Sequence, residues 1–263
     1  MNARICDHQY GDGAGGEHME RAIRALAEAR RAVAVTGAGI SVESGIPDFR
    51  SADGLWSRYP PDQFATIDAF YDDPDRVWVM WYELAETLGS VQPNPAHYAL
   101  ARLEKAGRLA GVITQNIDAL HHRAGSVNVV EFHGRADAIV CPACGRRRAM
   151  ELSHRAHGAP RCECGGYMKP DVVLFGEIIP PGPLAAAHAL ATSCDVMLVI
   201  GTSAQVYPAA SLPWMARENG ATIIECNTQP SAFTGNVTDI FLRGKAGEIL
   251  PVLADGVLGR AEI

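Results

Sequence analysis

The sequence predicts an α/β protein in which a parallel sheet is covered by helices on both faces, with a helical insert and a small zinc-binding module. Two observations support this prediction. Short apolar runs alternate with helical patterns along the chain, which is typical of a parallel sheet buried on both sides. Between two of these runs lie two tight pairs of cysteines, Cys141 with Cys144 and Cys162 with Cys164. Their spacing is typical of a metal site.

Composition narrows the class of protein. The chain has 263 residues, of which 48% are hydrophobic and 20% are charged, so it can form one large domain with a small insert. Its net charge of −7 argues against a nucleic-acid or membrane-surface binder. No apolar run approaches the roughly 20 residues of a membrane span, and the N-terminus lacks the apolar core of a signal peptide. We therefore expect a cytoplasmic protein. Our working expectation for its assembly is a monomer or a weak oligomer.

The predicted elements follow one another along the chain. The glycine-rich residues 1–17 are expected to be a flexible tail, and an apolar stripe predicts a helix over about 19–30. The predicted buried strands are 32–36, 110–114, 127–132, 172–175, 195–200, 221–225 and 239–242, with a helical pattern at 184–194. We assign a discontinuous Rossmann-like sheet domain to residues 18–42, 108–134 and 170–258.

Two segments interrupt the alternation. Residues 43–107 carry three tryptophans on a set of short helices, and we expect them to form a cofactor loop and a helical insert. Residues 135–169 hold the four clustered cysteines and few other apolar residues. A structural zinc ion can replace the missing core of such a module, since it contributes about 10–16 kcal/mol of apparent binding free energy in small modules.

The cysteine pattern predicts a closed metal site. Four thiolates complete the tetrahedral shell of Zn²⁺ and leave no position for water, so the site is structural and not catalytic. The second pair has one intervening residue, which could strain the site, and His154 and His157 are the substitutes nearby. A Cys-x-x-Cys redox role is an alternative, but it does not explain four clustered cysteines.

Polar and glycine-rich segments follow several predicted strands. The turn after the first strand, Gly37-Ala38-Gly39, could bring backbone N–H groups close to a pyrophosphate, although a tight structural turn explains the two glycines equally well. The polar run 114–118 ends the next strand, where open α/β sheets bind ligands, although its members could also cap a helix. His133 follows a third apolar run and could act as a base near neutral pH, or it could be structural.

The ordered set of these motifs resembles the sirtuins of the bacterial type, which are NAD-dependent protein lysine deacylases of the Sir2 family. The resemblance extends from about Val33 to Leu253. The motifs that carry it are Gly37 to Ser41, Gly45 to Arg50, Thr114 to Asp118, His133-Gly134, the two cysteine pairs, Phe175-Gly176-Glu177, Gly201-Thr202-Ser203 and Gly244-Lys245-Ala246.

The resemblance implies the ligands and the roles of the site residues. The residues implied in NAD binding are Gly37, Ala38, Gly39, Asp48, Phe49, Arg50, Gln115, Asn116, Ile117, Asp118, Gly201, Thr202, Ser203, Asn227, Lys245 and Ala246. The implied catalytic residues are His133, as general base, and Asn116. Acyl-lysine proteins would bind at Phe175, Gly176, Glu177 and Val206, and the products would be nicotinamide, O-acyl-ADP-ribose and free lysine. One structural zinc ion is implied at the four cysteines.

The acyl group is a further expectation. Sirtuins that remove succinyl or malonyl groups carry a tyrosine and an arginine where this chain has Trp81 and Leu84, and no arginine occurs between Val77 and Ala101. Since a carboxylate without a cation is costly to bury, we expect acetyl or other neutral acyl groups. Trp81 and Leu84 could equally be plain core residues. Mono-ADP-ribosyl transfer and a non-catalytic NAD-binding role are the alternative functions.

Overall fold

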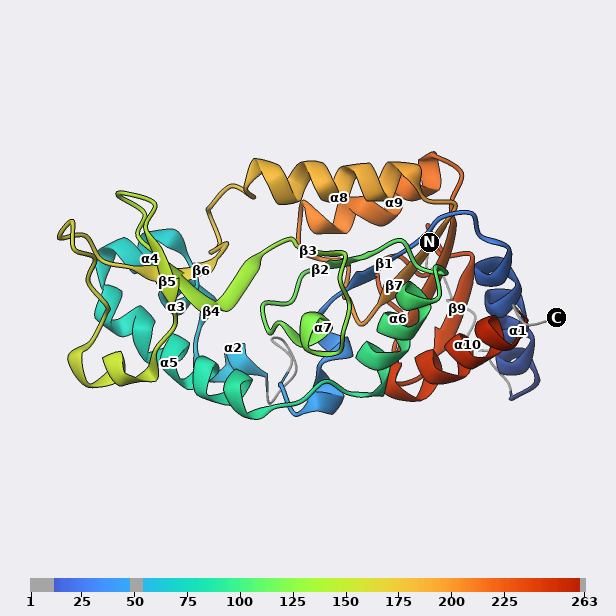
Figure 1. Cartoon of the computed structure of the whole chain (residues 1–263), viewed down its shortest axis with the longest axis horizontal. Coiled ribbons are helices and arrows are strands. Elements are labelled where there is room, and N and C mark those ends of the chain that lie inside the picture. Colours follow the sequence, from blue (N-terminus) through green and yellow to red (C-terminus); the bar gives the residue numbers. More distant parts are fainter. Residues whose placement is uncertain (1–11, 48–53, 261–263) are drawn as a thin grey trace, which may run out of the picture.

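The computed structural model describes residues 12–47 and 54–260, which form two lobes (Figure 1). Within these residues, six parallel strands form the sheet of the larger lobe in the order β3-β2-β1-β7-β8-β9. Their bounds are β1 Ala32–Thr36, β2 Val112–Thr114, β3 Val129–Glu131, β7 Val196–Ile200, β8 Thr222–Asn227 and β9 Ile240–Arg243. The prediction of a parallel sheet is therefore confirmed.

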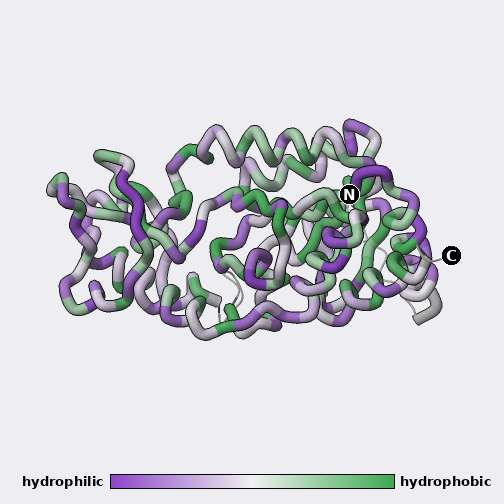
Figure 2. The backbone as a smooth tube through the Cα atoms, in the orientation of Figure 1, coloured by the Kyte–Doolittle hydropathy of each residue, from purple (hydrophilic) through white to green (hydrophobic). Residues whose placement is uncertain are grey.

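Helices cover both faces of this sheet, as the continuous apolar strands require. On β1, Val33 and Val35 pack in one cluster, and Ala32 and Ala34 pack in the other. One face is covered by α1 (Asp12–Glu28), α6 (Pro95–Lys105) and α10 (Ala246–Arg260). The other is covered by α8 (Pro181–Ser193) and α9 (Leu212–Glu218) (Figure 1). Figure 2 shows hydrophobic segments gathered where the strands run through the larger lobe.

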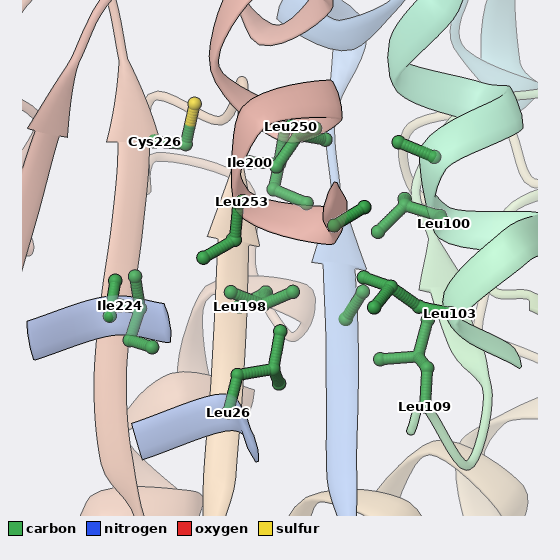
Figure 3. Packing of buried hydrophobic residues seen from close by; sticks show 14 of the residues in the cluster. Leu26, Leu100, Leu103, Leu109, Leu198, Ile200, Ile224, Cys226, Leu250 and Leu253 are labelled. Carbon is green, nitrogen blue, oxygen red and sulfur yellow. The ribbon is translucent and has the colours of Figure 1, made fainter. Parts of the chain in front are cut away.

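The first face shows how distant segments share one core. Leu26 of α1, Leu100 and Leu103 of α6, and Leu250 and Leu253 of α10 all point toward the strands (Figure 3). On the sheet they meet Leu198, Ile200 and Ile224. The leucines are buried almost completely, and burying one such side chain contributes about 1.5–3 kcal/mol. Helix α6 thus covers the sheet, although it belongs to the segment that we assigned to the helical insert.

The smaller lobe combines the rest of that insert with the cysteine segment. Its helices are α2 (Leu55–Arg58), α3 (Pro61–Phe64), α4 (Ile67–Asp72) and α5 (Pro74–Ser90). Its sheet is antiparallel in the order β5-β4-β6, with β4 at Gly134–Val140, β5 at Arg147–Ala149 and β6 at Lys169–Val172. Trp78 joins the two parts, because its indole N–H donates to the carbonyl of Met168 at 2.9 Å.

One predicted strand belongs to a different sheet from the one that we expected. We expected 172–175 as a strand of the parallel sheet, but the strand ends at Val172 and pairs with β4 in the small antiparallel sheet. Val172 and Leu174 pack into the core of the smaller lobe. A short apolar run is compatible with any buried segment, so the choice of partner depended on tertiary packing and not on the local pattern.

The first helix begins earlier than predicted, and the elements not yet described are short. Helix α1 starts at Asp12, seven residues before the predicted start, and so part of the predicted tail is helical. Helix α7 covers Leu120–Arg123, and 3-10 turns occur at Ala38–Ile40, Val42–Ser44, Leu152–His157 and Ala209–Ser211. Among the described residues, none of the helices has both the length and the apolar character needed to cross a membrane.

Candidate functional site

A cavity of about 560 Å³ lies between the two lobes. The larger lobe contributes the loops that follow β1, β2, β3, β7 and β8, and the smaller lobe contributes α2, α5 and the segment after β6. Most of the predicted site residues line this cavity: Gly37, Ala38, Gly39, Trp81, Leu84, Gln115, Asn116, Ile117, His133, Phe175, Gly176, Glu177, Gly201, Thr202, Ser203, Val206 and Asn227. Because the carboxyl ends of parallel strands share one edge, residues far apart in sequence meet here.

The loops after β1 and β7 are packed against each other too tightly for side chains. A Cβ atom on Gly39 would lie 2.7 Å from the Cα of Gly201, and one on Gly37 would lie 2.8 Å from the carbonyl oxygen of Gly201. The N–H of Gly39 donates to that same carbonyl at 2.8 Å. The glycines are therefore needed for the close packing of these two loops at the edge of the cavity.

A buried hydrogen-bond network holds Asn116 at the end of β2. Its amide Nδ2 donates to the carbonyl of Gly37 at 3.1 Å and to the hydroxyl of Ser41 at 3.0 Å. The Ser41 hydroxyl in turn donates to Asp118 at 2.7 Å. Burial raises the pKa of Asp118, and hydrogen bonds from the Leu120 N–H and from Ser41 oppose this shift. The network leaves the Asn116 side chain little freedom, as a ligand-orienting group requires.

His133 is held with one defined ring nitrogen as its base. Its Nδ1 lies 3.0 Å from the backbone carbonyl of Gln115, and since a carbonyl can only accept, Nδ1 carries the proton. Nε2 is then the unprotonated, basic nitrogen of the neutral ring. Burial lowers the pKa of His133, and the bond to Gln115 partly opposes this shift. His133 is therefore neutral and able to accept a proton at pH 7.

The end of the cavity in the smaller lobe is apolar. Met80, Trp81 and Leu84 of α5 line it together with Leu55 and Trp56. Within the described residues, no lysine or arginine lines the cavity. This end can therefore take an uncharged, largely apolar group.

The segment after β6 is anchored from both sides. The N–H of Phe175 donates to the carbonyl of Ala65, and the carbonyl of Phe175 accepts from the N–H of Ile67, both at 2.9 Å. Behind it, the buried ammonium of Lys169 pairs with Glu177 at 2.9 Å. This segment is therefore a preformed wall of the cavity.

The four clustered cysteines fit a tetrahedral metal ion. Their sulfur atoms all lie within 4.8 Å of one another, with Cys141 and Cys164 at 3.5 Å and Cys144 and Cys162 at 3.6 Å. Thiolates at about 2.3 Å from a tetrahedral Zn²⁺ lie about 3.8 Å apart, so the donor set matches this ion. Among the described residues the cluster contains no histidine, so His154 and His157 are not needed as ligands.

Several predicted site residues do not line the cavity. Asp118 lies behind Asn116 and Ser41, and Lys245 and Ala246 are outside the lining, although the N–H of Gly244 donates to the carbonyl of Asn227 at 3.1 Å. Asp48, Phe49 and Arg50 lie outside the described residues.

Sequence reasoning missed other lining residues. They include Leu55, Trp56 and Met80 at the apolar end, and Thr228, Gln229, Pro230, Ser231 and Ala232 after β8. The second group could have been found, because polar residues directly follow a predicted strand there, as they do at 114–118. The first group carries no comparable signal, since an apolar residue on a short helix looks the same whether it faces a core or a cavity.

Two buried imidazoles lie near the end of β1. The rings of His97 and His121 are 4.9 Å apart, and Nε2 of His121 lies 2.9 Å from the hydroxyl of Thr36 at the end of β1. Burial lowers the pKa of His97 to about 4. Burial, and then the nearby His97, lower the pKa of His121 well below its ordinary value. Both rings are thus neutral in the folded protein.

Acid should therefore destabilise the fold through these histidines. A group whose pKa is lower in the folded state than in the unfolded state favours unfolding as the pH falls from about 6.5 toward 4. For His97 alone we expect a loss of about 2 kcal/mol in the free energy of unfolding between pH 7 and pH 5. Urea denaturation of the unmodified protein and of His97→Gln at pH 7 and at pH 5 measures this loss. The variant should lose less stability than the parent, and equal losses would contradict the prediction.

Comparisons with known proteins agree with this geometry. The family model described as "Sir2 family" matches residues 37–208. The NAD-dependent protein deacylase of Pyrococcus furiosus is 48% identical over 238 residues, which are 88% of this chain and 95% of that protein. A solved Sir2 homolog–NAD complex matches with a TM-score of 0.87 and 43% identity, covering 92% of this chain and 94% of that one. Sir2Af2 bound to a myristoylated histone peptide matches with a TM-score of 0.78 and 38% identity, covering 94% and 100%.

Proposed function

The chain belongs to the Sir2 family, and on this premise we infer that it is an NAD-dependent protein deacylase acting on acyl-lysine side chains of proteins. The observation that carries this inference is that one cavity connects the glycine turn at Gly37–Gly39, the base His133 and the apolar end at Trp81 and Leu84. A dinucleotide, a proton acceptor and an acyl chain can thus meet in one place. We keep a cytoplasmic location as part of the proposal, because clustered thiols persist in a reducing compartment.

In this proposal each part of the cavity has one task. When bound, NAD supplies the leaving nicotinamide and the ADP-ribose that accepts the acyl group. The loops after β1 and β7 bind the pyrophosphate through backbone N–H groups near Gly39 and Thr202. Asn116 and Gln115 orient the ribose, Asn116 because it is fixed by Gly37 and Ser41, and Gln115 because its Nε2 lies 3.2 Å from the hydroxyl of Thr202.

His133 holds and moves the proton in this proposal. Its Nε2 accepts a proton from a hydroxyl of the sugar, and the bond from Nδ1–H to Gln115 keeps the ring in the required tautomer and stabilises the imidazolium that forms. The peptide lies along the wall at Phe175–Glu177 and opposite Val206, where main-chain hydrogen bonds give affinity with little side-chain selectivity. The lysine side chain then carries its acyl group into the apolar end.

The experiment that tests this function follows one peptide through the reaction. We would incubate an acetyl-lysine peptide with the protein, with and without NAD, and follow the products by mass spectrometry. Deacylation that requires NAD, with one nicotinamide released for each lysine freed, is the expected result. Transfer of ADP-ribose from labelled NAD to protein without an acyl peptide would instead favour the transferase alternative.

The acyl preference is a separate prediction. With no cation lining the cavity among the described residues, a succinyl carboxylate would lose its solvation without a partner. We expect kcat/KM for an acetyl peptide to exceed that for the matched succinyl peptide by at least about 10²-fold, which corresponds to about 3 kcal/mol. The double variant Trp81→Tyr with Leu84→Arg should shift the ratio toward succinyl. Faster removal of succinyl by the unmodified protein would contradict the prediction.

A further inference from the structure

Glu225 is a carboxylate buried completely beneath the loop that follows β8. Its exposed fraction is 0%, and it lies in the strand between Val199 of β7 and Phe241 of β9. Among the described residues, no lysine, arginine or histidine forms an ion pair with it. A buried acidic group without a cation must be satisfied by hydrogen bonds, and its surroundings show which ones.

Neutral donors from one connection surround this carboxylate. Oε1 accepts from the amide of Asn227 at 3.0 Å and from the hydroxyl of Ser231 at 2.5 Å. Oε2 accepts from the hydroxyls of Thr234 at 2.8 Å and Thr238 at 2.6 Å. The donors span the whole connection from the end of β8 to the residues just before β9. Glu225 therefore holds this loop in its folded shape through these four hydrogen bonds.

The same loop forms one wall of the cavity. Asn227, Ser231 and the residues between them line it, whereas Thr234 and Thr238 do not. Asn227 also donates from Nδ2 to the carbonyl of Thr202 at 3.1 Å, so the loop after β8 is tied to the loop after β7. The two oxygens of Glu225 thus have different tasks. Oε1 holds residues that face the ligand, and Oε2 holds the far half of the loop.

We propose that Glu225 is a positioning residue that fixes the 227–232 wall in the shape that binds NAD. The proposal rests on the proposed function, since it takes the ligand of the cavity to be NAD. Glu225 itself touches no ligand and takes no part in the chemistry at His133. Its loss should therefore weaken the binding of NAD and leave the peptide wall at Phe175–Glu177, on the other lobe, unchanged.

The test separates positioning from general stability. Glu225→Met keeps the side-chain length but accepts no hydrogen bonds, and it should raise KM for NAD at least about 10-fold, with kcat and the peptide KM within about 2-fold. Glu225→Gln should recover most of the affinity, because its amide oxygen can still accept from Asn227 and Ser231 while the rotatable threonine hydroxyls accept from its NH₂. Calorimetry with ADP-ribose gives the same comparison without turnover.

A matched control lies at the other end of the connection. Asp239 accepts from the N–H of Ile223 at 2.9 Å and pairs with Arg217 of α9, away from the cavity. Asp239→Asn should lower thermal stability without changing KM for NAD. If Glu225→Met does not fold, Thr238→Val removes one donor outside the cavity and should raise KM for NAD about 2- to 5-fold.

Two results would overturn the role of Glu225. One is an unchanged KM for NAD and an unchanged ADP-ribose affinity in the folded Glu225→Met or Thr238→Val protein. The other is an equal rise of the peptide KM, which would mean a general loss of structure. An unmodified protein that neither binds ADP-ribose nor deacylates would instead count against the proposed function, so the two failures can be told apart.

Discussion

Replacement of His133 by alanine should reduce kcat/KM for NAD-dependent deacylation by about 10²- to 10⁴-fold, the usual contribution of a positioned general base. The ring lines the cavity, and its Nδ1 proton is bonded to the Gln115 carbonyl. The basic nitrogen that the substitution removes is therefore Nε2. Binding of NAD should change little, because the loops at Gly37–Gly39 and Thr202 remain intact. Steady-state kinetics together with calorimetry of ADP-ribose binding measures both effects.

The pH profile gives an independent check on the same residue. Burial lowers the pKa of His133, so the ring stays neutral and active at and somewhat below pH 6.5, and activity should fall only on further acidification. His157→Ala, in the exposed 3-10 turn of the cysteine segment, is the matched control and should keep full activity. Activity of His133→Ala within a few-fold of the parent, with the same acid limb, would refute the assignment.

Removal of the metal from the four cysteines should abolish deacylation by unfolding the smaller lobe. Structural zinc contributes about 10–16 kcal/mol of apparent binding free energy in small modules, which is as large as the stability of a whole domain. The cysteine segment supports α5 directly, since Tyr82 donates from its hydroxyl to the carbonyl of Gly158 at 2.8 Å and Trp78 donates to Met168. Helix α5 carries Trp81 and Leu84, so its loss would disrupt the apolar end of the cavity.

The experiment compares metal content with folding and activity. Treatment with a strong chelator should lower near-UV circular dichroism from the tryptophans and remove activity, and added Zn²⁺ but not Mg²⁺ should restore both. Cys144→Ser should give the same defect, whereas Cys194→Ser, which alters a cysteine of the larger lobe outside the cluster, should keep bound zinc. A protein shown by elemental analysis to be free of zinc, yet fully active, would contradict this prediction.

Local sequence patterns determined most of the larger lobe and of the cavity edge. Continuous apolar runs such as 32–36 specify strands buried on both faces, and parallel strands place their carboxyl ends on one edge, so Gly37, Asn116, His133 and Thr202 had to meet. The four cysteines determined their own cluster, because the chemistry of thiolates and zinc leaves few alternatives. These features depend on residue type and spacing, which can be read in one dimension.

Only the tertiary structure decided against which sheet some apolar segments pack. The run 172–175 joined the small antiparallel sheet, and α6 packed on the large sheet, because apolar surface is buried wherever a complementary surface is available and its attraction has no direction. The role of Glu225 also emerged only in three dimensions, since four donors converge on it from a loop whose sequence shows no such pattern. A buried carboxylate is defined by its partners, and the fold supplies them.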